Sequence, residues 1–129
     1  MNARTDEGRV LVFTMVLASA IAACLGLVVD GGRMLIDATR AGTLAHEAAR
    51  AGARELDTAE LTAAGGVRLD EGAAVRRAEE HLHASGATGR AIVDGRRVVV
   101  TAEVPYTTVI LPLGGGRAQA RASATAVQD

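Results

Sequence analysis

Several residue types that common protein functions require are scarce in this sequence of 129 residues. It holds a single cysteine, Cys24, which excludes a disulfide framework and a multi-cysteine zinc site. Tryptophan and lysine are absent, and the 14 basic residues are all arginine. The formal net charge of −1 leaves no clustered excess of positive charge for phosphate groups, which excludes nucleic acid as the main partner.

Patterns typical of catalysis or metal binding are also missing. His81 and His83 lie two positions apart on a predicted helix and therefore point in different directions, which gives no metal site. The three glycines before Arg117 lack the Lys-Ser/Thr pair of a phosphate-binding loop. No serine stands in a nucleophile-elbow context. We expect no enzyme activity, catalytic residue, metal, cofactor or small-molecule substrate.

One long apolar run dominates what is present. Residues 10–29 contain no charged residue and no proline, and a helix of that length spans ~30 Å, the hydrocarbon thickness of a bilayer. We interpret the run as a retained transmembrane helix after a cytoplasmic leader at 1–9. Arg4 and Arg9 precede it, so the positive-inside rule favours a cytoplasmic N-terminus and an extracytoplasmic C-terminal domain.

Two other interpretations of the apolar run stay open. Residues 18–20 have the Ala-x-Ala pattern of a secretory cleavage site, although the run continues for nine residues beyond it. Residues 21–24 end at Cys24 as a lipobox does, although an apolar stretch follows instead of a polar tether. Either cleavage would release a lipoprotein or a secreted extracytoplasmic binding domain.

A helical pattern continues beyond the run through residues 30–57. Charged residues recur every three or four positions along one stripe. The opposite side carries small residues, which allow helix backbones to approach closely. We expect the membrane-proximal half of this seam to face partner subunits and the distal half to face the chain's own domain. The predicted helix-packing interface comprises Ala38, Ala41, Gly42, Ala45, Ala48, Ala49 and Gly52.

The start of this segment lies at the expected membrane edge. Asp30 and Arg33 are close enough on a helix to pair, which lowers the cost of a carboxylate near the bilayer. The glycines between them, Gly31 and Gly32, favour a local loosening of the helix. An interfacial anchor is the favoured interpretation of the Asp30–Arg33 pair, and a hinge or assembly contact is the alternative.

Residues 58–129 predict a small α-β-β-β domain with few large apolar side chains. A loop is expected at 58–67, followed by a short amphipathic helix that Asp70 caps and Gly86 stops. Because alanine supplies much of its apolar content, the core is expected to be thin and to gain stability from a partner.

Three strands follow in the predicted order. Residues 94–95, Asp-Gly, predict a type I′ hairpin between the first two strands, and Pro105 is expected to end the second. Alanine at every second position of 117–127 predicts a last strand whose all-alanine face lies against the small-residue seam. The fold class is therefore α+β: a long N-terminal helix, a short helix and a three-stranded antiparallel sheet.

The connection between the last two strands is apolar. Large apolar residues precede three glycines there, and such a composition is unfavourable for a loop exposed to water. One interpretation is a flap that covers the small sheet, and an equally favoured one is a contact with a neighbouring subunit or the membrane surface. The candidate contact residues are Val109, Ile110, Leu111 and Leu113.

Three stretches of the sequence resemble one family. Residues 6–13 (DEGRVLVF), 26–33 (GLVVDGGR) and 47–53 (EAARAGA) resemble actinobacterial TadE/TadG-like proteins of tight-adherence, Flp-type pilus assembly systems. The resemblance covers about the first 57 residues, and the later hairpin and alternating strand are similar more loosely. It implies a pilin-like membrane protein, a minor pilin or pseudopilin. Its implied partners are other pilin-like subunits, the pilus assembly platform and membrane lipid.

The same resemblance implies a candidate processing site. Prepilins are cut after a glycine and favour glutamate five residues later, and Gly8 and Arg9 would supply the cut. Phe13 stands where that glutamate is usual, so processing is disfavoured. An unprocessed protein would stay in the cell membrane and act as an assembly platform or initiating component of the pilus.

Overall fold

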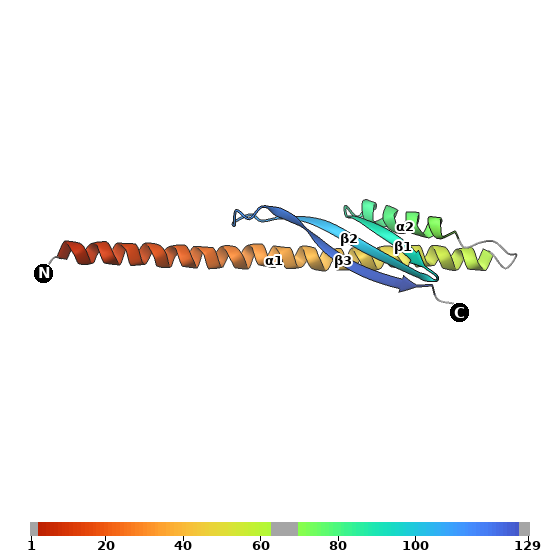
Figure 1. Ribbon diagram of the computed structural model, residues 1–129, viewed down its shortest axis with the longest axis horizontal. Coiled ribbons are helices and arrows are strands. Elements are labelled where there is room, and N and C mark those ends of the chain that lie inside the picture. Colours follow the sequence, from red (N-terminus) through yellow and green to blue (C-terminus); the bar gives the residue numbers. More distant parts are fainter. Residues whose placement is uncertain (1–2, 63–69, 127–129) are drawn as a thin grey trace.

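The computed structural model describes residues 3–62 and 70–126. The long helix α1 (Ala3–Thr62) is followed by α2 (Glu71–Ala84) and by strands β1 (Thr88–Asp94), β2 (Arg97–Thr107) and β3 (Gly115–Thr125). Figure 1 shows α1 running the length of the molecule, with the other elements gathered along its C-terminal half. The predicted α+β layout is confirmed.

Helix α1 is a single uninterrupted helix of 60 residues. It passes straight through Gly31 and Gly32, so the expected loosening there is not seen. Each glycine costs only about 1 kcal/mol relative to alanine, which the helix-forming residues on both sides can offset. The helix also runs to Thr62, five residues into the predicted loop, and the rest of that loop lies outside the described residues.

Helix α2 has the limits and the buried face that its sequence predicts. Asp70 caps it, since the Asp70 side chain accepts a hydrogen bond from the backbone N–H of Ala73 at 3.1 Å. Ala74, Ala78 and Leu82 are its buried residues. Gly86 follows the helix in the left-handed region, with φ at +75°.

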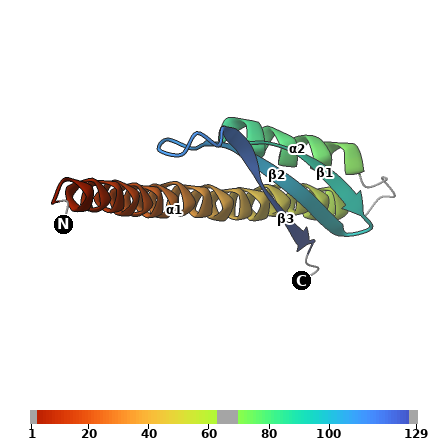
Figure 2. The same ribbon diagram turned by 60° about the vertical axis from the view of Figure 1, so that its left-hand side comes forward.

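The three strands form an antiparallel sheet in the order β1-β2-β3. Figure 2 shows this sheet crossing α1 obliquely. Asp94 pairs with Arg97, so the hairpin loop consists of Gly95 and Arg96. Gly95 has φ at +60°, and no non-glycine residue of the described chain has a positive φ. A positive φ at the first central residue alone is typical of a type II′ turn, so the predicted type I′ turn is wrong.

The sequence predicted that β2 ends at Pro105, but the strand continues to Thr107. Pro105 pairs with Arg117 of β3, while the β1 partner strand begins at Thr88, opposite Glu103. Beyond Glu103, β2 therefore has a neighbour on one side only, where a proline without an N–H group is tolerated. This extension carries the β2–β3 connection toward the N-terminal half of α1.

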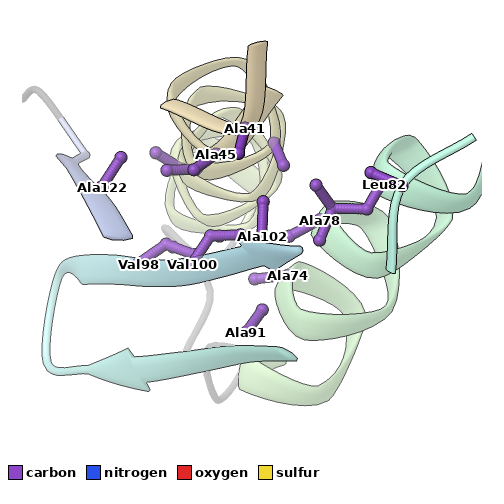
Figure 3. Close-up of a cluster of buried hydrophobic side chains, with 14 of the residues drawn as sticks. Ala41, Ala45, Ala74, Ala78, Leu82, Ala91, Val98, Val100, Ala102 and Ala122 are labelled. Carbon is purple, nitrogen blue, oxygen red and sulfur yellow. The ribbon is translucent and has the colours of Figure 1, made fainter. Parts of the chain in front are cut away.

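Alanine makes up most of the core. Both helices and the inner face of the sheet meet there, and Figure 3 shows their side chains pointing toward one another. The predicted all-alanine face of β3 is present, with Ala118 and Ala122 buried. The largest fully buried side chains are only Leu56, Leu82, Val98 and Val100. Small side chains allow α1 to lie close to the sheet, as predicted from the alternating pattern.

Candidate functional site

The site begins with a buried carboxylate on α1. Asp30 is 5% exposed, and its oxygens accept hydrogen bonds from three consecutive backbone N–H groups of the β2–β3 connection. The donor–acceptor distances are 2.9 Å for Val109, 3.1 Å for Ile110 and 2.7 Å for Leu111. Hydrogen bonds to an ionised acceptor are among the strongest in proteins, so this carboxylate fixes the connection to the helix.

The same contacts set the charge state of Asp30. Its pKa is lowered from the ordinary value of 3.8, first by the N–H of Leu111, then by those of Val109 and Ile110, against the opposing effect of burial. The positive charge of Arg33 lowers the pKa further. Asp30 is therefore ionised at neutral pH, and it is the ionised form that holds the backbone donors.

Gly26 completes the contact one helical turn earlier. A Cβ atom at Gly26 would lie 2.9 Å from Cγ2 of Ile110 and 3.4 Å from Cδ2 of Leu111. The absence of a side chain therefore allows the connection to lie directly on the helix. Gly26 and Asp30 form a docking seat for residues 109–111, and we call the segment 108–114 the docked turn.

The ends of β2 and β3 hold the docked turn from the other side. Gly114 has φ at +80°, and its carbonyl accepts hydrogen bonds from the N–H and hydroxyl of Thr108, at 3.3 and 2.7 Å. Tyr106 pairs with Gly116, and a Cβ atom on Gly116 would lie 2.7 Å from Cζ of the tyrosine ring. The ring thus covers the backbone of Gly116 and fills the space that its missing side chain leaves.

The apolar residues of the docked turn divide between the helix and the surface. Leu111 is half-buried against α1, whereas Val109, Ile110 and Leu113 are 62%, 52% and 74% exposed. Figures 1 and 2 show the turn projecting past the end of the sheet and over α1. The turn covers part of α1 instead of the sheet.

Asp30 and Arg33, which the sequence predicts as a membrane-edge pair, make different interactions. The hydrogen bonds of Asp30 go to the docked turn, while Arg33 is exposed and affects Asp30 through its charge. Arg33 lines a shallow groove with Tyr106 at the exit of β2. The pairing itself stays a prediction.

The predicted helix-packing residues lie mostly inside the chain's own domain. Ala41, Ala45, Ala48 and Ala49 are fully buried in the core, and Gly52 is buried as well. A Cβ atom on Gly52 would lie 3.0 Å from the carbonyl oxygen of Ala74 in α2 and 3.0 Å from Cγ1 of Val98 in β2. From Ala41 onward, the seam therefore packs mainly against the chain's own sheet and α2.

The remaining two seam residues, Ala38 and Gly42, are less buried than the other five. Gly42 is half-buried, and a Cβ atom there would lie 3.9 Å from Cβ of Ala120. Ala38 is exposed. A partner contact in the membrane-proximal half stays a prediction, and Ala38 is the seam residue that such a contact can reach.

The candidate processing site lies in the uncovered first turns of α1. Gly8, Arg9 and Phe13 are exposed, and a Cβ atom on Gly8 would meet no atom within 4 Å. By length and composition, α1 is a candidate membrane span. Processing at Gly8 stays a prediction.

One histidine of α2, His81, takes part in a contact with α1. His81 Nε2 lies 3.6 Å from a carboxylate oxygen of Glu47, and Arg40 donates to the carbonyl of Ser85 at 3.4 Å. Among the described residues, no group of three or more histidine, cysteine, aspartate or glutamate side chains is placed to hold a metal ion. Two residues of the charged stripe of α1, Arg40 and Glu47, thus contact the C-terminal end of α2.

Sequence reasoning missed the contact between Asp30 and the docked turn. About 80 residues separate its two halves, so no local spacing relates them. The available signals were separate: a carboxylate at the end of an apolar run, a glycine four residues before it, and an uncharged connection between two strands.

Comparison with known proteins adds no relative: no family model, curated protein or solved structure matches this chain. The resemblance to tight-adherence pilus proteins therefore depends on the residue patterns at 6–13, 26–33 and 47–53.

Proposed function

We propose that this protein is a pilin-like, single-pass membrane subunit or assembly component of a tight-adherence pilus. Its N-terminus is cytoplasmic and its small α-β-β-β domain is extracytoplasmic. The observation that supports this proposal is the division of α1 into an apolar stretch, exposed at every position from 10 to 25, and a C-terminal half packed against its own domain.

The exposed stretch 10–25 is apolar around its whole circumference. Val10, Leu11, Val12 and Phe13 occupy four consecutive positions, and each is 63–68% exposed. Four consecutive helical residues point in directions about 100° apart, so no single protein surface could cover them all. A lipid environment accounts for this exposure without a large partner, because apolar side chains there avoid water on every side.

The region just beyond the apolar run offers a face for other subunits. Leu35 is 69% exposed, and Ala38, one turn along, is exposed too. Both lie after Asp30, outside the expected membrane span. We propose that this face contacts a neighbouring pilin-like subunit, in keeping with the predicted partner role of the membrane-proximal seam.

Piliation of the native host tests this face. A strain lacking the gene is complemented with the wild-type chain, with Leu35→Arg or with Thr43→Arg, an exposed position two turns further along α1. We expect Leu35→Arg to abolish pili while the protein stays membrane-integrated and folded, and Thr43→Arg to support normal piliation. Normal piliation of the gene-deficient strain would contradict the proposed function, and normal piliation with Leu35→Arg would contradict the proposed face alone.

Mass spectrometry of the N-terminus of the protein from native membranes separates the anchored form from its alternative. An intact N-terminus, or one cut after Gly8, is expected. A lipid on Cys24 or a cut after Ala20 would contradict the proposal and indicate the lipoprotein or secreted binding domain instead.

A further inference from the structure

We propose that the docked turn is a second membrane contact, which inserts its apolar tip into the lipid interface beside α1. The inference rests on the proposed function in one respect, that α1 crosses a bilayer through residues 10–29. The occupant to which we assign the exposed tip is lipid, at the membrane surface where that run ends.

The first argument is position along the helix. The turn contacts Gly26, three residues before the end of the apolar run, so it reaches about 5 Å below that end at 1.5 Å per residue. Segments that bind membrane interfaces insert their apolar side chains by about 5–10 Å. A bilayer that covers the whole run therefore meets the tip of the turn as well.

The second argument is composition. Four large apolar residues are exposed in the described chain after α1, and three of them are Val109, Ile110 and Leu113 of the docked turn. The sequence has no charged residue from 104 to 116. The exposed apolar surface is thus concentrated at the end of the domain that is nearest to the apolar run (Figure 1).

The third argument is the backbone, because an N–H group that enters lipid without an acceptor is costly. Asp30 accepts from the N–H groups of residues 109–111, as described above. The N–H of Thr108 donates to Gly114 at 3.3 Å, and that of Leu113 donates to the carbonyl of Leu111 at 2.8 Å. Pro112 has no N–H group. Every N–H group from 108 to 113 therefore has an acceptor within the chain or is absent.

Aromatic and basic side chains lie where a membrane interface would place them. Tyr106, the single tyrosine of the sequence, and Arg33 line the same groove just beyond the docking seat. Tyrosine is enriched at the level of lipid headgroups, and arginine can extend its guanidinium group toward water or phosphate there. Both side chains therefore suit the lipid interface to which we assign the tip.

Fluorescence quenching in vesicles tests this inference with the full chain. In a Cys24→Ala background, single cysteines are introduced by Leu113→Cys in the turn, Ile92→Cys at an exposed apolar position of β1, and Val16→Cys in the apolar run. Each variant carries an environment-sensitive dye and is reconstituted in phosphatidylcholine–phosphatidylglycerol vesicles. Lipids with a shallow nitroxide report contact with the interface, lipids with a nitroxide deeper in the acyl chain report contact with the hydrocarbon core, and aqueous iodide reports contact with water.

We expect the shallow nitroxide to quench the label at 113 at least about twofold more than the label at 92, with iodide giving the opposite order. Asp30→Ala should remove lipid quenching at 113 and leave it unchanged at 16, because only the turn loses its seat. Circular dichroism checks that each variant retains its helix and sheet content.

Three results would overturn the inference. If iodide quenches the labels at 113 and 92 equally, the turn lies in water. If the label at 113 escapes both quenchers and becomes exposed when protein is diluted in lipid, its occupant is another copy of the chain. If the label at 16 also escapes nitroxides placed at every depth, α1 does not cross the bilayer, and the anchor of the proposed function fails together with the inference.

Discussion

The two halves of α1 reverse the usual relation between side-chain size and burial. The N-terminal half carries the large apolar side chains and exposes them, as Phe13 does with 68% of its surface. The C-terminal half carries mainly alanine on its inner face and buries it completely, as at Ala45. The difference indicates that the two halves have different surroundings. One suits a lipid solvent and the other suits close contact with a sheet.

The largest expected effect comes from a charge in the buried half. Ala45→Arg places a guanidinium at a fully buried position of the alanine core, and we expect it to destabilise the domain by more than about 4 kcal/mol. Thermal unfolding in nanodiscs, followed by circular dichroism, measures the loss of cooperative domain unfolding. Membrane integration through residues 10–29 should be unaffected. Thr43→Arg is the control, with an expected change within about 0.5 kcal/mol.

A charge in the uncovered half should have the opposite pattern. Leu17→Arg puts a charge near the middle of the apolar run, at a cost of about 2.5–3.5 kcal/mol for insertion. We expect less protein to resist alkaline extraction from membranes, while the distal domain keeps its unfolding temperature in detergent. Loss of domain stability in Leu17→Arg would contradict the separation of the two halves, as would loss of membrane integration in Ala45→Arg.

The smallest expected effect is on the docked turn, which joins the two halves at Asp30. Because the pKa of Asp30 in the folded protein lies below 3.8, its ionised form stabilises docking above that value. This stabilisation is lost as the pH falls below 3.8 through the lowered pKa. We expect protection of the backbone N–H groups of 109–111 from hydrogen exchange to stay constant from pH 7 to about pH 4 and then to fall.

Asp30→Asn is the matched control for that measurement, because the amide keeps the shape of the side chain without its titration. Exchange rates are corrected for the intrinsic effect of pH in both proteins. The variant should show weaker protection at pH 7 and no transition below pH 4. The same transition in both proteins would show that another group causes it.

Much of the fold follows from local patterns. The cap at Asp70, the amphipathic pattern of α2 and the alternating alanines of β3 are all present as predicted. Each depends on residues within a few positions of one another, where helix and strand periodicity act directly. Two errors arose where strand pairing decided the outcome. The type of the turn at Gly95 and the end of β2 at Pro105 depended on which strands are paired and how far they extend.

The candidate site could be predicted only in pieces. The sequence singles out both the apolar connection and the carboxylate of Asp30. It pairs Asp30 with Arg33, however, and assigns the connection either to a flap over the sheet or to a contact with a neighbouring subunit or the membrane surface. The sequence also identifies the small-residue seam. Because Ala41 and Ala45 are fully buried in the chain's own core, substitutions there would disturb folding of the domain before they could report on assembly. No local pattern in the sequence indicates which distant segment covers a given face.

The sequence by itself determined the apolar run, the small-residue face of α1 and the alternation of the strands, because each is a periodicity of side chains along one element. Only the tertiary structure decided that the docked turn reaches Gly26 and Asp30. That contact requires that β2 extends past Pro105, that the sheet crosses α1 obliquely, and that α1 has no side chain at Gly26. Three backbone donors then meet one carboxylate across about 80 residues of sequence, which only the packing of the chain can bring together.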